Sequence, residues 1–563
     1  MKAGTNFQRI LPFLLLTGIP LIFLLLFFYV PLASIFAYGL ADERGRITLK
    51  YIWAVLSNNY YQGVLSFTLY QAFLSTLFAL FLGLPGAYIL SHFTFPGKKI
   101  VSGITTVPFV LPPILVVLGF VLFFGNSGVL NGFLMKLFGR EEPVIRVLYS
   151  LKAIILAHGF YNFPICIKIV AAVWGNVSAH EIEAAGTLGA GRRRVFFTVT
   201  LPQILPGILS AAALIFLFCF LSFAVILVLG GGPQVTTLEV EIYRLAKVSL
   251  NLRDAGALAL IGSVLSLCIM YLYTFLQNTV HSGYISGSVS KSRPIASMFR
   301  GWKGFFLFLY IALIILLVVS PVITVIMRSF QYRFGWGDQI RFGFRWYQEL
   351  FSQNSLYGTT AFRAIRNTFI NGMMTVLLSL GIGTLFAYVL NKQNLKFKRL
   401  IDTAVMLPLG VSPIILGLSY IKIIQALPIE IKNQWILISL AHTIIAYPFV
   451  IRSVSAVFRR IPQSYINAAA TLGASPVKIF FTVYLPLLRP GLIAGAAFAF
   501  ALSAGEMNAA IILSGEKSIT IPIAIYRMIG SYNFFGACAL GVILIIMCSG
   551  AFIFIDKIGG VRE

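Results

Sequence analysis

EAAGTLGAGRRRVFFTVTLPQILPG, residues 183–207, and NAAATLGASPVKIFFTVYLPLLRPG, residues 467–491, are two versions of one segment, displaced by 284 positions. The same displacement relates further pairs, namely His158 and His442, Pro164 and Pro448, and Pro206 and Pro490. Earlier in the chain a displacement of 300 relates Thr68 to Thr368, Tyr88 to Tyr388 and Pro108 to Pro408. The change of displacement places extra residues within residues 123–143. The sequence therefore predicts two related halves.

The composition indicates a membrane protein. Of the 563 residues, 59% are hydrophobic and 11% are charged, whereas about a quarter of a soluble domain is charged. Apolar runs long enough to cross a hydrocarbon core of about 30 Å recur along the chain. We predict an all-α integral membrane protein with about twelve spans in two six-span halves, at residues 10–38, 67–91, 100–124, 151–174, 207–229, 255–277, 304–327, 367–391, 401–425, 434–457, 491–514 and 535–555.

Basic residues beside the spans predict the orientation. With the N-terminus inside the cell, four short basic clusters face the cytoplasm, as the positive-inside rule requires: Lys98–Lys99, Arg192–Arg194, Lys396 with Lys398–Arg399, and Arg459–Arg460. The predicted external segment 328–366 is basic as well. We attribute the net charge of +26 to contact with anionic membrane lipid, and we expect no nucleic-acid partner.

The repeats predict the domain organisation. Repeats with the same topology are related by an axis along the membrane normal, and substrate sites lie between them. We expect a first transmembrane half at residues 1–277, a polar cytoplasmic linker at residues 278–303 and a second half at residues 304–563. The linker is rich in Ser and Gly, as flexible connectors are. The five cysteines lie in apolar spans without a CxxC pair, so we expect neither a disulfide nor a metal site.

The repeated segment has the composition of two short helices joined by a bend. Glu183 and the two alanines after it favour helix, Gly189 tolerates a left-handed turn, and Leu201–Pro202 restarts a helix. This pattern, EAA, Gly189, then V-T-L-P, resembles the EAA loop of binding-protein-dependent ABC importer permeases. In that family the cytoplasmic loop is a coupling helix that docks on an ATP-binding subunit. The second copy departs from the pattern by placing Asn467 where Glu183 stands.

The resemblance implies a type I ABC importer permease fold in a bacterial cytoplasmic membrane, with two ATPase subunits and an extracytoplasmic solute-binding protein as partners. The chain has no G-x-x-x-x-G-K-[ST] phosphate loop, so we expect ATP and Mg to be used by the ATPase and no cofactor or catalytic residue in this chain. The expected coupling residues are Glu183, Ala184, Ala185, Gly189, Pro202, Asn467, Ala468, Ala469, Gly473 and Pro486. An interfacial amphipathic loop is the alternative.

Two later segments bear on the substrate, LGGGPQVTTLEVEIYR at residues 229–244 and LSGEKSITIPIAIYRMIGSY at residues 513–532. They resemble the fused permease of thiamine importers. The ferric-iron permeases are the alternative, and those for sulfate, spermidine or putrescine are more distant. We expect an outer gate or a binding-protein contact at five residues, for which interfacial anchoring is the alternative: Glu241, Tyr243, Arg244, Tyr526 and Arg527.

Glu506 is the most unusual residue of a predicted span, because a carboxylate near the bilayer centre costs roughly 2.5–3.5 kcal/mol. We expect it to line the translocation pathway with Ser222, its counterpart in the first half, and Asn508. A structural hydrogen bond to a neighbouring helix is an equally favoured role for Glu506. For His158 and His442, a hydrogen bond that fixes helix packing is favoured over contact with a substrate or metal. An ion-coupled secondary transporter would use Glu506 as a relay, but it has no ATPase for the repeated loops to meet.

Overall fold

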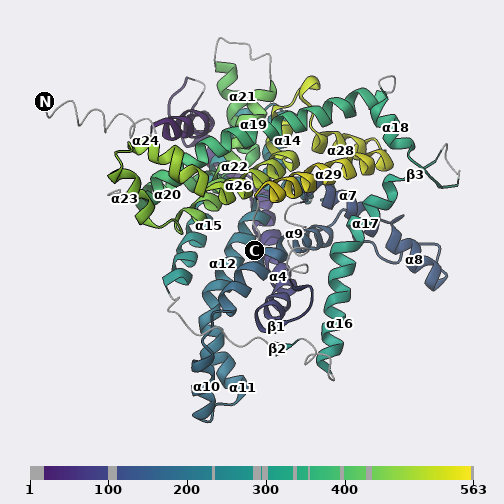
Figure 1. The fold of residues 1–563 in the computed structure, drawn as a ribbon. Coiled ribbons are helices and arrows are strands. Elements are labelled where there is room, and N and C mark those ends of the chain that lie inside the picture. The colour runs from purple at the N-terminus through teal and green to yellow at the C-terminus, as the bar shows by residue number, and fades with distance from the viewer. Residues whose placement is uncertain are drawn as a thin grey trace. The chain divides into compact units, whose positions relative to one another are not determined.

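The computed structural model describes residues 18–42, 44–98, 111–230, 232, 235–282, 293–294, 302–333, 339–352, 356–392, 398–426 and 434–559. Most of the predicted linker 278–303 and the beginnings of predicted spans 10–38 and 100–124 lie outside these residues. The regular secondary structure of the described residues is helical apart from two ladders of two-residue strands and one isolated bridge. The predicted all-α membrane fold is therefore confirmed (Figure 1).

The chain divides into two compact units. The N-terminal unit comprises Ile52–Arg244 and Leu260–Ser329, and the C-terminal unit comprises Met1–Tyr51, Leu245–Ala259 and Phe330–Glu563. Three helices cross these boundaries, namely α3 (Lys50–Ser57), α14 (Leu238–Lys247) and α15 (Leu252–Ser282). The units therefore combine segments from both sequence halves.

The N-terminal unit is built around α4 (Asn59–His92), α9 (Leu151–Trp174) and α12 (Leu201–Phe220), which pack against one another. Gly83 permits the close approach of α4 to α9, because a Cβ at Gly83 would lie 2.5 Å from the Cβ of Cys166. The other elements are β1 (Phe93–Thr94), α7 (Pro113–Phe124), α8 (Val129–Phe138), α10 (Ala179–Thr187), α11 (Arg192–Val195), η2 (Phe196–Thr200), α13 (Ala224–Leu229), β2 (Arg293–Pro294), α16 (Trp302–Ile314), η5 (Ile315–Val319) and α17 (Ser320–Ser329).

The C-terminal unit repeats this arrangement with α19 (Leu356–Lys392), α22 (Gln434–Phe458) and α26 (Arg489–Gly505) at its centre. The other elements are η1 (Leu25–Tyr29), α2 (Val30–Gly39), β3 (Gln331–Tyr332), β4 (Arg341–Phe342), α18 (Arg345–Phe351), α20 (Lys398–Met406), η6 (Leu407–Gly410), α21 (Pro413–Ala426), α23 (Gln463–Thr471), α24 (Pro476–Ile479), η7 (Phe480–Tyr484), α25 (Leu485–Leu487), α27 (Asn508–Leu513), η8 (Glu516–Ser518), α28 (Ile521–Gly530) and α29 (Phe534–Gly559).

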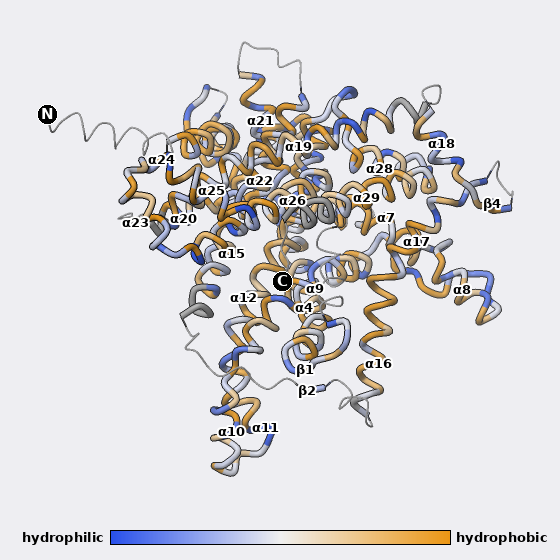
Figure 2. Tube along the Cα trace, viewed as in Figure 1, coloured by the Kyte–Doolittle hydropathy of each residue, from blue (hydrophilic) through white to orange (hydrophobic). Residues whose placement is uncertain are grey.

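The described residues contain ten helices long and apolar enough to cross a membrane, and up to twelve if each of two bent pairs is one span. The bent pairs are Ile401–Gly410 with Pro413–Ala426, at 97°, and Pro476–Leu487 with Arg489–Gly505, at 72°. Each of the twelve predicted spans overlaps one of these segments. The segment Gly304–Ser329 has mean hydropathy 3.0 and is mostly uncovered by protein, and α16 is apolar along its length (Figure 2). Such a surface is suited to lipid.

Besides the ninth predicted span, which bends by 97° between Gly410 and Pro413, two predicted spans are broken in the structure. The fifth was expected to run unbroken over residues 207–229 and the eleventh over residues 491–514, but α12 ends at Phe220 and α26 ends at Gly505. The short helices α13 and α27 follow after breaks of three and two residues at matching places in the repeat. Interrupted helices at membrane depth need polar partners for the freed backbone groups, and these partners lie at the breaks.

The first helix of each sequence half packs against helices of the other half. The Tyr29 hydroxyl donates to the Ala404 carbonyl at 2.9 Å, and the Tyr420 hydroxyl donates to the Phe27 carbonyl at 2.7 Å. In the N-terminal unit, the Tyr310 hydroxyl of α16 donates to the carbonyl of α4 residue 82 at 3.0 Å. Tyrosines thus join the exchanged helices to the halves that receive them.

Candidate functional site

The first repeated segment forms a helix, a glycine turn and a second helix. Helix α10 ends at Thr187, and Gly189 follows with φ +82°. The Ala190 N–H bonds the Ala185 carbonyl at 3.1 Å, and the Gly189 N–H bonds the Gly186 carbonyl at 3.0 Å. These two bonds are those of a Schellman turn, in which glycine avoids the steric cost of left-handed backbone. The predicted left-handed turn at Gly189 is confirmed.

The second repeated segment has the same geometry. Gly473 follows α23 with φ +79°. The Ala474 N–H bonds the Ala469 carbonyl at 3.1 Å, and the Gly473 N–H bonds the Ala470 carbonyl at 3.0 Å. The replacement of Glu183 by Asn467 therefore leaves the shape of this segment unchanged.

Most residues of both repeated segments are exposed on the surface of the protein. Eight of the ten expected coupling residues are exposed, and Ala185 and Ala469 are half-buried. The most exposed apolar side chains here were not among those expected: Leu188 is 88% exposed and its counterpart Leu472 is 87% exposed. Their signal in the sequence was a large apolar residue before the turn glycine in both copies. Within the N-terminal unit, α10 and α11 project beyond the end of α12 (Figure 1).

The second helix of each segment begins earlier than predicted. It restarts at Arg192 rather than at Leu201, and the first copy runs to Phe220. A π-helical turn, η2, precedes Pro202, and the Leu201 N–H bonds the Phe196 carbonyl five residues back. The second copy has the same turn, η7, before Pro486. Because proline removes a donor and clashes with the carbonyl four residues earlier, the wider turn lets the helix continue through it.

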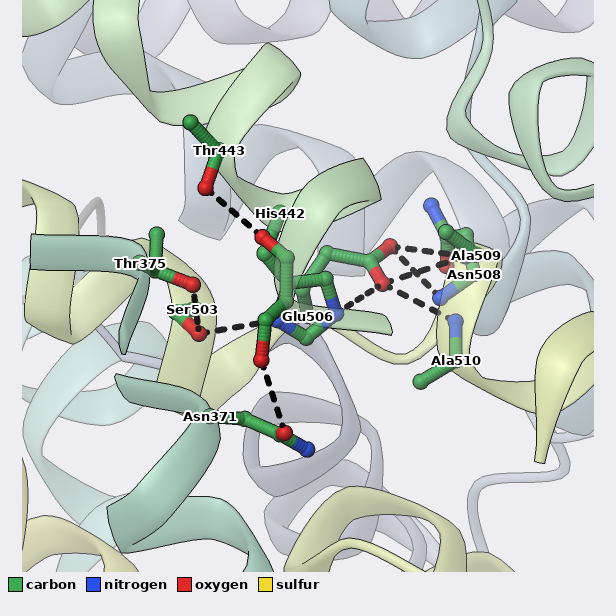
Figure 3. A network of polar contacts seen from close by, with 10 residues as sticks. Asn371, Thr375, His442, Thr443, Ser503, Glu506, Asn508, Ala509 and Ala510 are labelled. Carbon is green, nitrogen blue, oxygen red and sulfur yellow. Dashed lines mark hydrogen bonds and ion pairs between the residues drawn. The ribbon is translucent and has the colours of Figure 1, made fainter. Parts of the chain in front are cut away.

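A polar cluster links the three central helices of the C-terminal unit (Figure 3). We call Thr375, His442, Ser503 and Glu506 the His442 node. His442 Nδ1 lies 2.8 Å from the Ser503 hydroxyl, which lies 3.1 Å from that of Thr375. His442 Nε2 lies 3.1 Å from Glu506 Oε2, and the two side chains are 0% and 8% exposed. The node joins α19, α22 and α26 at the break.

Glu506 belongs to the break rather than to a continuous span. Its carboxylate accepts bonds from the backbone N–H groups of Asn508, Ala509 and Ala510, at 2.7–3.2 Å. These are the first N–H groups of α27, which have no partner within that helix. A carboxylate at a helix N-terminus is favourable electrostatically as well. The alternative of a structural hydrogen bond for Glu506 therefore describes the observed contacts, and Asn508 contributes its backbone.

The N-terminal unit has a neutral version of this cluster, the His158 node, formed by Ser75, His158 and Ser222. His158 Nδ1 lies 3.0 Å from the Ser75 hydroxyl, and Nε2 lies 2.8 Å from the Ser222 hydroxyl. Its members come from α4, α9 and the break after α12. The predicted role of both histidines in hydrogen bonds between helices is confirmed.

The segments after the breaks also carry a duplicated contact. The Thr68 hydroxyl of α4 accepts the Leu238 N–H of α14 at 3.0 Å. The Thr368 hydroxyl of α19 accepts the Ile521 N–H of α28 at 2.9 Å. A threonine therefore caps α14 in one half and α28 in the other, as a side-chain oxygen does at many helix starts.

The residues expected at the outer gate differ between the halves. Glu241 is fully buried and binds Arg244 through both oxygens, at 2.6 and 2.9 Å, and Tyr60 donates to it at 3.0 Å. The hydrogen bonds that Arg244 donates to Glu241 raise the pKa of Arg244 above its ordinary value. Tyr243 packs on Phe223, with ring centroids 5.3 Å apart.

The second half has no carboxylate at the position matching Glu241. Tyr526 is half-buried and Arg527 is exposed. Glu239, two residues before Glu241 on α14, is also 0% exposed, and it is not among the residues predicted from the sequence. The signal that could have revealed Glu239 was a second acid two residues before Glu241 in an otherwise uncharged stretch.

Comparisons with known proteins bear on these features. Residues 75–286 and 379–558 match the family model described as "Binding-protein-dependent transport system inner membrane component". The chain is 26% identical to a thiamine transport system permease protein of Haemophilus influenzae, over 95% of this chain and 94% of that one. For the protein of that name from Escherichia coli the values are 26%, 90% and 91%.

Among solved structures, an alginate-importing bacterial ABC transporter matches 51% of this chain and all of its own, with 19% identity and a TM-score of 0.40. The family match covers most of the chain and both sequence repeats. Its two segments contain both turns, both histidine nodes except Thr375, and both helix breaks. The chain is therefore a member of the binding-protein-dependent transport system inner membrane component family, a multi-pass protein of the cytoplasmic membrane.

Proposed function

We propose that this chain is the fused permease subunit of an ATP-driven importer for thiamine or its phosphates. The observation that carries the proposal is similarity from end to end with thiamine transport permeases, 95% of this chain against 94% of the Haemophilus protein. A match over single spans would indicate the family alone. A match over nearly the whole length of both halves supports a shared substrate class.

The described contacts place one limit on how a cation would pass. Glu506 receives four contacts from backbone N–H groups and one from His442. A carboxylate has about four lone-pair sites, so little capacity is left for a thiazolium ring. We therefore assign Glu506 to the support of α27, with Ser222 as its neutral counterpart. Direct binding of the substrate by this carboxylate is not part of the proposal.

Energy would come from two copies of a separate ATPase subunit, one docked on each repeated segment. Both segments present the same shape, with a glycine turn and an exposed leucine, so two identical clefts could receive them. Leu188 and Leu472 are exposed at matching positions of the two segments, and a partner that covered them would remove apolar surface from water. The basic residues Arg192, Arg193 and Arg194 are exposed beside the first turn and would favour an acidic rim on the partner.

Reconstituted transport tests the substrate. The chain, its ATPase and its solute-binding protein would be placed in liposomes containing ATP and Mg, and uptake of radiolabelled thiamine would be compared with that of ferric iron. We expect ATP-dependent uptake of thiamine. Uptake of iron without thiamine would contradict the substrate assignment, and uptake without ATP would contradict the class.

Paired substitution tests the docking. The double variant L188D and L472D should lose at least roughly tenfold in co-purification with the ATPase, because a charge is costly in an apolar interface pocket. Both side chains are exposed, so the fold should be unaffected. The matched control is Ile47→Asp, equally exposed at 88% and on the side predicted to face outward. Normal co-purification of the leucine variant would contradict the docking.

A second experiment tests the turns themselves. Replacing Gly189 and Gly473 with bulky residues should abolish substrate-stimulated ATP hydrolysis.

A further inference from the structure

Three non-glycine residues of the described chain have left-handed backbone: Tyr149 with φ 57°, Leu250 with φ 54° and Tyr532 with φ 58°. This conformation costs an L-residue roughly 1–2 kcal/mol. All three side chains are large and exposed, at 60%, 75% and 82%. Large residues therefore occupy positions where glycine or asparagine would be less strained.

Leu250 and Tyr532 occupy one repeated turn. The sequence reads SLNL at residues 249–252 and SYNF at residues 531–534. The first turn joins α14 to α15, and the second joins α28 to α29. In the predicted topology both turns lie at the outer face, before the last span of each half. Both belong to the C-terminal unit, so that unit fixes the position of each relative to the other.

Hydrogen bonds hold each turn on both sides. After α28, the Tyr532 N–H bonds the Ile529 carbonyl at 3.1 Å and the Asn533 N–H bonds the Met528 carbonyl at 2.9 Å, so Tyr532 occupies the glycine position of a Schellman turn. The Asn533 side chain then accepts the Gly536 N–H at 3.0 Å. Because hydrogen bonds hold the chain both before and after Tyr532, its backbone cannot relax out of the left-handed conformation.

The first turn is one residue longer and is held in the same way. The Asn251 N–H bonds the Leu245 carbonyl at 2.9 Å, and the Asn251 side chain accepts the Asp254 N–H at 3.2 Å. Leu250 therefore projects from a fixed loop. The duplication of an asparagine after each strained residue indicates that the turn, and not only its sequence, is repeated.

The two repeated segments show that glycine can close the same kind of turn in this chain without a strained L-residue. Gly189 and Gly473 stand at the position that Tyr532 occupies after α28. The cost at Tyr532 is not offset by burial, since the ring is 82% exposed and its aromatic neighbour Phe534 lies 6.2 Å away between centroids. Strained backbone of this kind is typical of functional sites.

We infer that Leu250 and Tyr532 are a pair of fixed apolar knobs that dock into the solute-binding protein. The inference rests on the proposed function. The family depends on a binding protein, the turns lie on the predicted outer face, and tyrosine is enriched among the residues that dominate interface energies. Lipid headgroups are the competing occupant. A fluid surface accepts a side chain in many orientations, so it gives no reason to retain a strained backbone, whereas a rigid pocket does.

Glycine substitution separates docking from folding. The double variant L250G and Y532G removes both knobs and relieves both left-handed residues, so its thermal stability should equal or exceed that of the parent. We expect its affinity for thiamine-loaded solute-binding protein, measured on nanodiscs that also contain the ATPase, to fall at least roughly tenfold. Basal ATP hydrolysis should be unchanged, and stimulation by the binding protein should be lost.

Three comparisons make the test decisive. The double variant L250A and Y532A keeps the strain and removes the side chains, so it should lose docking equally; retained docking would attribute the effect to backbone flexibility and overturn the inference. Tyr149→Gly removes a strained, exposed aromatic residue outside the repeated turn and should dock normally; equal loss would overturn the pairing. In the variant Tyr532→Trp, brominated lipids should not quench the fluorescence of the new tryptophan, because the inference places this side chain outside the lipid. Strong quenching would assign the side chain to the membrane and overturn the inference.

Experiments on the parent protein distinguish a failure of the docking inference from a failure of the proposed function. If thiamine-loaded binding protein docks on the parent and on the glycine variant with equal affinity, the inference about Leu250 and Tyr532 is wrong and the proposed function stands. If it neither docks on the parent nor stimulates ATP hydrolysis, the proposed function fails and the knobs fail with it.

Discussion

The His158 node and the His442 node use one scaffold for two kinds of chemistry. Each places a histidine between three central helices beside a broken span. Around His158 the partners are the hydroxyls of Ser75 and Ser222, whereas His442 has Ser503 on one nitrogen and the Glu506 carboxylate on the other. Only the second node has an acid that also caps the helix after the break. A duplicated fold has thus acquired one charged and one neutral support.

The largest expected difference between the nodes comes from removing the acid. Glu506→Ala should lower the free energy of unfolding by about 2–4 kcal/mol, because it removes a helix cap and leaves buried N–H groups without an acceptor. The matched variant Ser222→Ala should cost about 0.5–1.5 kcal/mol, the value of one neutral hydrogen bond. Denaturant unfolding in mixed micelles measures both. Equal costs would mean that the two breaks are supported alike.

Removing each histidine tests the same difference from the other side. Both substitutions to alanine leave a similar cavity, so the cavity cost should be common to the pair. His442→Ala also leaves Glu506 without its side-chain partner, and we expect it to be about 1 kcal/mol more destabilising than His158→Ala. The comparison uses the same unfolding assay. A larger loss for His158→Ala would contradict the assignment of charge to the second node.

The threonine caps should behave alike, because they lie outside the charged contacts. Thr68→Val and Thr368→Val each remove one acceptor from the first turn of a following helix. We expect each to cost about 1 kcal/mol, equal within about 0.5 kcal/mol. Hydrogen exchange at the amides of Leu238 and Ile521 should rise in the respective variant and not in the other. Unequal exchange would show that the halves differ beyond their nodes.

The smallest effect is expected from giving the first node an acid. Ser222→Glu places a carboxylate before α13, whose first N–H groups offer the contacts that α27 offers to Glu506. Because a negative charge is favourable at a helix start, the variant should stay within about 0.5 kcal/mol of the parent. Its unfolding should be compared with that of Ser222→Lys, which reverses the charge. A variant with glutamate as unstable as the one with lysine would show that the first break cannot hold an acid.

Sequence reasoning was most successful where a feature depends on local chemistry. Apolar length located the spans, and the repeated Gly189 and Gly473 predicted turns that the structure confirms. It failed at the breaks, because residues 221–223 and 506–507 lie inside apolar runs and hydropathy carries no information on backbone bonding. The early restart at Arg192 was missed for a related reason: a π-helical turn before Pro202 has no compositional signal.

Features that depend on distant contacts were beyond reach. The sequence shows Glu506 as an acid in an apolar run, but its role follows from N–H groups that only the break exposes. Leu250 and Tyr532 gave no signal, because left-handed backbone is expected at glycine and asparagine. The packing of the first helix against the second half rests on tertiary contacts alone, and periodicity along one helix cannot identify its partner.

That exchange of first helices has a consequence for synthesis of the chain. The hydroxyl of Tyr29 and the carbonyl of residue 27 meet partners that lie 375 and 393 positions later. At roughly 5–20 residues per second on the ribosome, the first helix leaves the translocon about 20–80 seconds before its partners exist. During that interval it must be stable as a lone helix in lipid, which its continuous apolar surface allows, and assembly of the C-terminal unit can be completed only after most of the protein has been translated.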